Sequence, residues 1–263
     1  MTFALRNVPE RIVCLTEEPT ETLYLLGEQH RIVGISAYTE RPPEARRDKP
    51  VVSAFIGGSV PKVAALEPDL VIGFSDIQGD LARDLIKASL PVLIFNQRTV
   101  QDILDVIVTL GRIVGAEDRA RALVGGYIDR LHALQSRNEA RTDRPRVYFE
   151  EWDEPTITAI AWVSELIELA GGRDVFADRA HRKLATERFV THEEVIRSDP
   201  EIVIASWCGK DFDREAFLSR PGFAELAAAR SDRIHEMDPA IILQPGPACL
   251  SAGLDWLEGH INR

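Results

Sequence analysis

The second half of this chain repeats the plan of the first half. Residues 67–73 (EPDLVIG) are echoed by residues 199–205 (DPEIVIA), and residues 11–15 (RIVCL) are echoed by residues 146–150 (RVYFE). Both echoes occur in the same order and at nearly the same offset. Each apolar run has the length of a buried strand, so the repeat predicts two matched lobes. Two matched lobes joined once predict a ligand cleft between them, because small ligands bind in such clefts.

Strand patterns alternate with helical patterns on both sides of the middle of the chain, which predicts parallel sheets with helices on both faces. After Thr99 the alternation stops, and residues 117–137 form one long helical pattern. The pair Gly125-Gly126 weakens this helix unless close packing requires small residues there. We therefore predict an α/β fold of two Rossmann-like lobes joined by one long rigid helix. The expected boundaries are an N-terminal lobe over 1–115, a linking helix over 116–143 and a C-terminal lobe over 144–263.

The charge balance excludes several partners. Forty-two acidic and thirty-one basic residues give a formal net charge of −11, whereas nucleic acid and anionic membranes attract concentrated positive charge. No run approaches the ~18–20 apolar residues that cross a bilayer, so we expect no membrane insertion. The first ten residues lack a basic stretch followed by an apolar run. From the sequence as it stands we expect a cytoplasmic protein, or a periplasmic one if a leader has been removed.

The sequence lacks the common catalytic motifs. It contains no GxSxG, no GxxxxGK[ST] and no HExxH. The six histidines are scattered, and although His192 precedes two glutamates, adjacent residues on a helix point in different directions. We therefore expect no catalytic residues, no metal site and no permanently bound cofactor.

Aromatic and polar residues gather where the predicted strands end, which is where open α/β sheets bind ligands. Trp152 is expected directly after a strand, and Trp207 follows the strand at 201–205. Flat aromatic side chains with a few polar groups suit a large, planar, partly apolar ligand. The predicted ligand-binding residues are Tyr38, Phe55, Phe74 and Gln97 in the first lobe, and Glu150, Trp152, Trp162 and Trp207 in the second.

Several of these motifs resemble a known family. The run at 11–16 (RIVCLT), the segment at 33–36 (VGIS) with Tyr38 nearby, and above all the run at 66–72 (LEPDLVI) match its pattern. The chain resembles the substrate-binding proteins of metal-chelate ABC importers, the class whose two lobes are joined by a single helix. Within that class it is most similar to the cobalamin-binding proteins, and the similarity extends over residues 9–257.

The resemblance implies a metal chelate as ligand and an ABC permease as partner. Tyr38 falls where cobalamin binders place a tyrosine of the ligand site, and Trp152 and Trp207 lie near their second-lobe ligand loops. The family docks on its permease through one acidic residue in each lobe. Glu193 matches the second-lobe acid, whereas Pro61 stands at the first-lobe position, so one docking contact is missing.

Three hypotheses remain open from the sequence. In the first, both lobes hold a cobalamin-like corrinoid without catalysis, and Glu150 or Glu151 orients its amide or nucleotide groups. In the second, the same scaffold binds haem or a ferric siderophore, for which Arg41, Arg46, Arg98 and Arg182 are candidate contacts. In the third, the scaffold serves a cytoplasmic enzyme or salvage factor, with Cys208 as its only conspicuous nucleophile.

Overall fold

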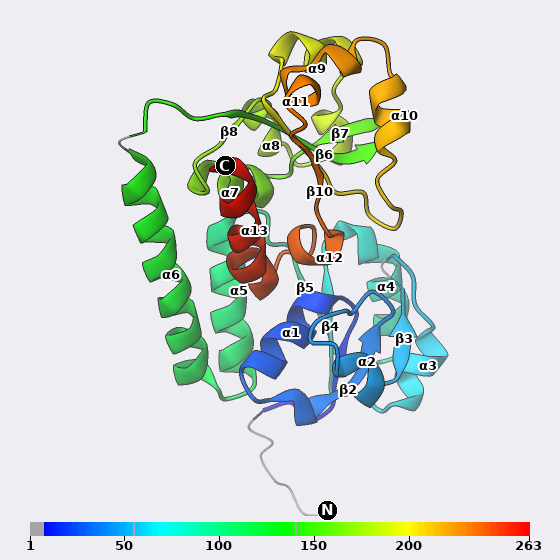
Figure 1. Cartoon of the computed structure of the whole chain (residues 1–263). Helices are drawn as coiled ribbons and strands as arrows, with labels where there is room; N and C mark the ends of the chain where they lie inside the picture. The colour runs from blue at the N-terminus through cyan, green and yellow to red at the C-terminus, as the bar shows by residue number, and fades with distance from the viewer. Residues whose placement is uncertain (1–7, 55, 140) are drawn as a thin grey trace, which may run out of the picture. The chain divides into compact units, whose positions relative to one another are not determined.

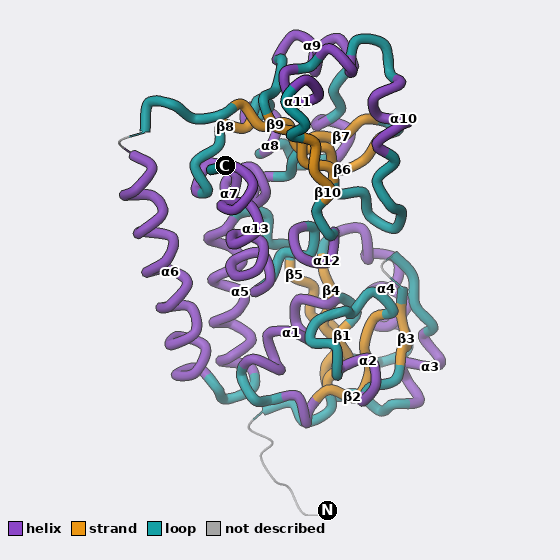
Figure 2. Tube along the Cα trace, viewed as in Figure 1, coloured by secondary structure: helices purple, strands orange, loops and turns teal. Residues whose placement is uncertain are grey.

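Each half of the chain folds around its own β-sheet. The computed structural model describes residues 8–54, 56–139 and 141–263. Within them the chain divides into two units, the first comprising residues up to Gln97 with 101–126, and the second comprising 98–100 with 127–263. Figure 1 labels the elements of both, and Figure 2 shows helices and strands alternating along the trace. The predicted α/β class with two parallel-sheet lobes is confirmed.

The sheet of the first unit is parallel throughout and has the order β3-β2-β1-β4-β5. The elements are, in chain order, β1 (Ile12–Cys14), α1 (Glu17–Leu25), η1 (Gln29–Arg31), β2 (Ile32–Ser36), α2 (Ala45–Asp48), β3 (Val51–Ser53), α3 (Val60–Ala65), β4 (Leu70–Phe74), η2 (Asp76–Gln78), α4 (Gly79–Lys87) and β5 (Val92–Phe95). Strand β1 therefore lies in the middle, and the chain adds β2 and β3 on one side of it before β4 and β5 on the other. This reversal places a topological switch point between β1 and β4.

Both faces of this sheet are buried, which is why its strands are apolar without alternation. Ile12 and Cys14 pack into a cluster with residues of α1 and α5 (Val100–Ile113). Val13 and Leu15 point to the opposite face and pack with residues of α3 and α4. The alternation of side chains along β1 thus supplies two cores at once.

The sheet of the second unit has the order β10-β9-β6-β7, and β8 also pairs with β6. Its elements are β6 (Arg146–Asp153), β7 (Thr156–Thr158), α7 (Ala161–Leu169), β8 (Arg173–Asp174), α8 (Ala177–Ala180), η3 (Ala185–Arg188), α9 (His192–Ser198), β9 (Ile202–Ala205), α10 (Arg214–Ser219), η4 (Phe223–Glu225), α11 (Ala227–Arg230), β10 (Ile234–Glu236), α12 (Pro239–Ile242), η5 (Cys249–Gly253) and α13 (Leu254–Ile261). Strands β8, β9 and β10 follow the parallel direction of β6, but β7 runs antiparallel to it. The switch point of this sheet lies between β6 and β9.

Helix α6 (Glu117–Glu139) occupies most of the predicted linking segment, and the boundary between the two units falls inside it, after Gly126. A Cβ atom built on Gly125 or Gly126 would meet nothing within 4 Å. Close packing therefore does not explain this glycine pair.

The repeat in the first unit corresponds to a set of hydrogen bonds around Arg11. The Arg11 guanidinium donates from Nε to the carbonyl oxygens of Leu66 and Glu67, each at 3.1 Å, just beyond the end of α3. The Arg11 backbone N–H donates to the Asp69 carboxylate at 2.9 Å, and the Asp69 N–H donates back to the Arg11 carbonyl at 2.9 Å. Glu67 has a left-handed φ of 47°, which turns the chain from the helix toward β4.

Arg146 makes the same set of bonds in the second unit. Its Nε and Nη2 donate to the Asp199 carbonyl at 3.0 and 2.8 Å, at the end of α9. Its backbone N–H donates to the Glu201 carboxylate at 2.9 Å, and the Glu201 N–H donates to the Arg146 carbonyl at 2.8 Å. Asp199 has a left-handed φ of 39°. We call this set of bonds the arginine clamp. The residues that repeat in the sequence form it in both units.

We predict that Arg146→Ala lowers the free energy of unfolding by about 2 kcal/mol, because charge-assisted bonds to backbone carbonyls are among the stronger hydrogen bonds of a protein. Urea unfolding followed by circular dichroism measures the change. Arg197→Ala is the matched control, since Arg197 is exposed in the last turn of the same α9. Equal losses in the two variants would contradict a specific role for the clamp.

Candidate ligand-binding site

The switch point of the second sheet brings together two of the predicted tryptophans. Glu150 of β6 pairs in register with Ala205 of β9, and the Ser206 N–H donates to the Glu150 carbonyl at 2.9 Å. Trp207 therefore leaves β9 beside the final residues of β6, which include Trp152. Trp152 lies within β6 and pairs with Ile157 of β7, so the prediction that it follows the strand was wrong. The hairpin to β7 extends β6 beyond the buried apolar run.

Glu150 is fully buried and its carboxylate is enclosed by the protein's own donors. Arg220 donates to both oxygens, at 2.7 and 3.0 Å. The Tyr148 hydroxyl donates to Oε2 at 2.9 Å, and Trp207 Nε1 donates to Oε1 at 3.2 Å. Burial, with the neighbouring Glu150 charge, raises the pKa of Tyr148 well above its usual value. Glu150 thus orients Trp207, and the expectation that it contacts the ligand directly is corrected by its burial.

Glu151 is also engaged by an arginine. The Arg188 guanidinium, itself only 3% exposed, donates to Glu151 at 2.5 and 3.1 Å and to the Thr158 carbonyl at 2.5 Å. The carboxylates of Glu150 and Glu151 therefore pair with the partly buried Arg220 and the buried Arg188, and the predicted role of either in orienting ligand amides does not fit this geometry.

Lys210 adds a cation to the two tryptophans. Its ammonium lies 4.6 Å from the ring centroid of Trp152 and 4.7 Å from that of Trp207, within the range of cation–π attraction. It also donates to both carboxylate oxygens of Asp153 at 2.7 Å. Burial opposes ionisation of Asp153, but the bond to Lys210 and its charge lower the Asp153 pKa below the usual value.

Lys210 and Asp153 were missed in the sequence, although each lies within three positions of a predicted tryptophan. Arg220 gave no such signal, because it lies 70 positions from Glu150. Trp162 is predicted to line the site, but it is 3% exposed in α7 and its Nε1 donates to the Ile242 carbonyl at 2.8 Å. In this structure Trp162 is a core residue of the second unit.

The predicted residues of the first unit differ widely in exposure. Tyr38 is 45% exposed in the turn after β2, whereas Phe74, at the end of β4, and Gln97 are 6% and 3% exposed. Phe55 lies outside the described residues. Tyr38 is therefore the one predicted first-lobe residue, among those that the structure describes, with a largely open side chain.

Two buried glutamates stand at the switch point of the first sheet and were not predicted. Glu17 and Glu18 begin α1 directly after β1, where acidic residues complement the helix dipole and usually face solvent. Here they are only 1% and 4% exposed. Burial raises the pKa of Glu17 to about 8 and that of Glu18 to about 7.

Glu17 fixes the loop that follows Tyr38. Its Oε2 accepts the backbone N–H groups of Glu40 and of Arg41, the latter at 3.0 Å. Its other oxygen is buried without a hydrogen-bond partner. Arg41 in turn pairs with Glu21 of α1 at 3.5 Å. The loop that follows Tyr38 is therefore held by a carboxyl group whose raised pKa keeps it protonated at neutral pH.

We predict that Glu17 makes the protein less stable as pH rises. Its folded pKa of about 8 lies above the unfolded value of 4.5, so its stabilising contribution is complete below pH 4.5 and is lost as pH rises through 8. Glu17→Gln keeps an oxygen for both N–H groups and has no proton to lose.

Between pH 5 and 8, wild type should lose on the order of 2–4 kcal/mol of unfolding free energy relative to Glu17→Gln, as measured by urea unfolding. Glu40→Gln, in the same loop but exposed, should retain the wild-type pH profile; parallel profiles for wild type and Glu17→Gln would contradict the prediction.

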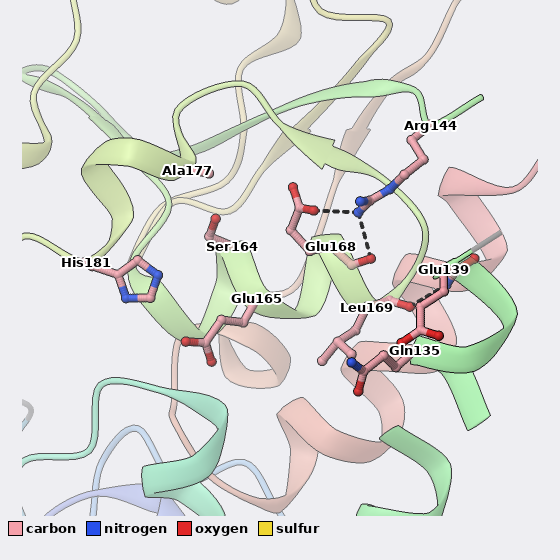
Figure 3. A pocket seen from close by; sticks show the side chains of 10 residues that line it. Gln135, Glu139, Arg144, Ser164, Glu165, Glu168, Leu169, Ala177 and His181 are labelled. Atoms are coloured by element: carbon pink, nitrogen blue, oxygen red, sulfur yellow. Dashed lines mark hydrogen bonds and ion pairs between the residues drawn. The ribbon is translucent and has the colours of Figure 1, made fainter. Parts of the chain in front are cut away.

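A separate hollow of about 490 Å³ lies on the helical side of the second unit (Figure 3). Residues of α6, α7 and α8 line it, and an ion pair between Arg144 and Glu168 borders it. No predicted ligand residue lines this hollow. It is distinct from the switch point between β6 and β9.

Other kinds of site find no support among the described residues. Within residues 8–54, 56–139 and 141–263, no group of three or more His, Cys, Asp or Glu side chains is placed to hold a metal ion. Over the same ranges, no helix is long and apolar enough to cross a membrane. Burial, together with the nearby Glu151, raises the pKa of the Cys208 thiol, which is the opposite of nucleophile activation.

The family profile described as periplasmic binding protein matches residues 12–241, which is most of the chain. The chain belongs to the periplasmic binding protein family. The resemblance seen in the sequence is thereby confirmed, and membership identifies a ligand-binding protein and not an enzyme.

Curated relatives extend over almost the whole chain. A vitamin B12-binding protein of Vibrio parahaemolyticus is 27% identical over 97% of this chain and 91% of its own length. A vitamin B12-binding protein of Pectobacterium atrosepticum is 25% identical over 92% of this chain and 88% of its own length. An uncharacterised ABC transporter substrate-binding lipoprotein of Bacillus subtilis is 23% identical, over 98% and 81%.

Solved structures share the fold. The periplasmic vitamin B12-binding protein of Vibrio cholerae matches with a TM-score of 0.76 and 22% identity, over 97% of both chains. A periplasmic haem-binding protein from Pseudomonas aeruginosa matches with a TM-score of 0.82 and 23% identity, over 97% of this chain and 93% of its own. At these identities the likeness shows the fold alone, since it includes proteins described by different ligands.

The predicted docking positions occupy equivalent places in the repeat. Glu193 is the second residue of α9, and Pro61 is the second residue of α3, the helix that precedes the matching clamp. Both residues are exposed. The Glu193 pKa is lowered chiefly by its own backbone N–H and by the Thr191 hydroxyl. A capping box of Thr191 and Glu194 begins α9, and the docking role of Glu193 stays a prediction.

Proposed function

We propose that this protein binds a cobalamin-like corrinoid as the substrate-binding component of an ABC importer. The observation that carries the proposal is the pair of indoles, Trp152 and Trp207, at the switch point of the second sheet. Indole faces suit the broad, partly apolar surface of a corrin, and Tyr38 offers an exposed aromatic group on the first unit.

Three arginines near the predicted ligand residues are already paired with carboxylates of the protein. Arg188 and Arg220 are committed to Glu151 and Glu150, and Arg41 pairs with Glu21. These three arginines are therefore neutralised within the protein and are not available to an anionic siderophore. The relatives named as vitamin B12-binding proteins support the same ligand class.

Titration of the purified protein with cyanocobalamin and hydroxocobalamin tests the ligand class. Haem and a ferric hydroxamate serve as comparators. We expect corrinoid binding that is tighter than that of either comparator. If no corrinoid binds below about 100 μM, which corresponds to a weak interaction, the proposed ligand is wrong.

We predict that Trp152→Ala and Trp207→Ala each weaken cyanocobalamin binding by roughly 1–3 kcal/mol, the range for an aromatic anchor at an interface. Isothermal titration measures both. Trp256→Phe is the control, because Trp256 stacks on His260 near the end of the chain, in α13. Undiminished affinity in both alanine variants would place the ligand elsewhere.

The importer role also requires that the protein meets its ligand outside the cytoplasm. We propose a periplasmic location on this ground, and fractionation of the native cells tests it. A wholly cytoplasmic protein could not collect ligand for an inner-membrane importer. That result would remove the importer from the proposal and leave corrinoid binding to be judged by the titration.

A further inference from the structure

Trp207 is a proposed ligand contact that has almost no free surface. It is only 3% exposed, although it lies two residues after the end of β9. Glu150 holds its Nε1 from one side, and Phe212 meets the ring edge-on with centroids 5.0 Å apart. Lys210 covers the ring from above at 4.7 Å. Of these neighbours, Lys210 is the one whose side chain is substantially exposed, at 41%.

Lys210 occupies the space where a ligand would stack. Its ammonium lies over both indoles, and Asp153 holds it through two bonds of 2.7 Å. Two indoles and a carboxylate form the kind of cage that binds an ammonium group. The cage is therefore filled by a side chain of the protein itself.

The backbone around Lys210 is suited to movement of this side chain. Lys210 belongs to the segment 206–213 between β9 and α10, whereas Asp153 and Trp152 belong to the sheet. Gly209, directly before Lys210, has a φ of 87° and no atom within 4 Å of its Cβ direction. The Lys210 side chain is itself 41% exposed, so solvent already reaches the side of the cage from which it can leave.

We propose that Lys210 is a tethered occupant of the second-lobe ligand surface, and that a corrinoid stacks on Trp207 only after displacing it. This inference rests on the proposed function. Lys210 then determines affinity and selectivity, because each ligand must replace the two cation–π contacts and the ion pair with Asp153. A neutral planar ligand cannot form an ion pair with Asp153, so displacing Lys210 lowers the affinity for such a ligand.

The test compares cyanocobalamin binding to wild type, Lys210→Ala and Lys210→Arg by isothermal titration. Lys210→Ala should bind about tenfold tighter, since exposed cation–π contacts and ion pairs are each modest but act together here. Lys210→Arg keeps a cation in the cage and should bind no tighter than wild type. Lys183→Ala, which removes an exposed lysine of the same unit, is the matched control and should leave affinity unchanged. Equal or weaker binding by Lys210→Ala would overturn the proposal.

A second measurement needs no ligand. In the free protein, the ε-protons of Lys210 should resonate upfield of the other lysines because two indole rings shield them, and Lys210→Ala identifies the signal. Cyanocobalamin should return it to the ordinary lysine position. A Lys210 signal at the ordinary position in the free protein would overturn the occupancy. A further outcome is an upfield signal in a protein that binds no corrinoid, either as wild type or as Lys210→Ala. In that case the proposed function is wrong, and so is the displacement by a corrinoid. The position of Lys210 between the two indoles would still be correct.

Discussion

Both halves of this chain depend on an arginine that joins the start of a central strand to the end of a later helix. In the first unit Arg11 bonds to Asp69, 58 positions away, and in the second Arg146 bonds to Glu201, 55 positions away. Each arginine also satisfies carbonyl groups that the end of a helix leaves without partners. The clamp therefore sets the register between the first strand and the strand beside it, which is the pair that flanks the switch point. Everything proposed about ligand binding depends on the side chains that this pair presents.

In the second unit, an ion pair between the buried Glu150 and the partly buried Arg220 lies beside this pair of strands. Removing Glu150 and Arg220 from water is costly, and an apolar pair of the same shape is often as stable. What the pair supplies is orientation, because the Glu150 carboxylate also receives Tyr148 and Trp207. The Trp207 Nε1 is thus bonded to the Glu150 carboxylate, and its ring is covered by the Lys210 side chain. The first unit uses different chemistry at the corresponding place, where Glu17 holds a loop through a protonated carboxyl group.

The strands that belong to the repeat could be predicted from the sequence. The apolar runs within 11–15 and 67–73 form β1 and β4, as the repeat predicted. Antiparallel β7 was not foreseen, because a three-residue strand gives too short a pattern. Trp152 and Trp207 could be placed near strand ends from chain order alone. Chain order could not show whether Glu150 faces a ligand or Arg220, because Arg220 lies 70 positions away. The burial of Glu17 was equally hidden, since acidic residues at a helix start are normally solvated.

The central position of β1 and β6 has a consequence for the order in which the chain acquires structure. Each is the first strand of its unit to be synthesised, yet it needs neighbours on both sides: β2 and β4 for one, β8 and β9 for the other. The chain must pay the entropy of closing a loop of more than fifty residues before the stabilising contacts between these strands can form. A nascent chain that has emerged only as far as β3 therefore presents β1 with one open edge and an arginine without its acid. In each half, the central strand and its arginine gain their remaining partners only when the Pro-containing echo, at 67–73 or 199–205, has left the ribosome.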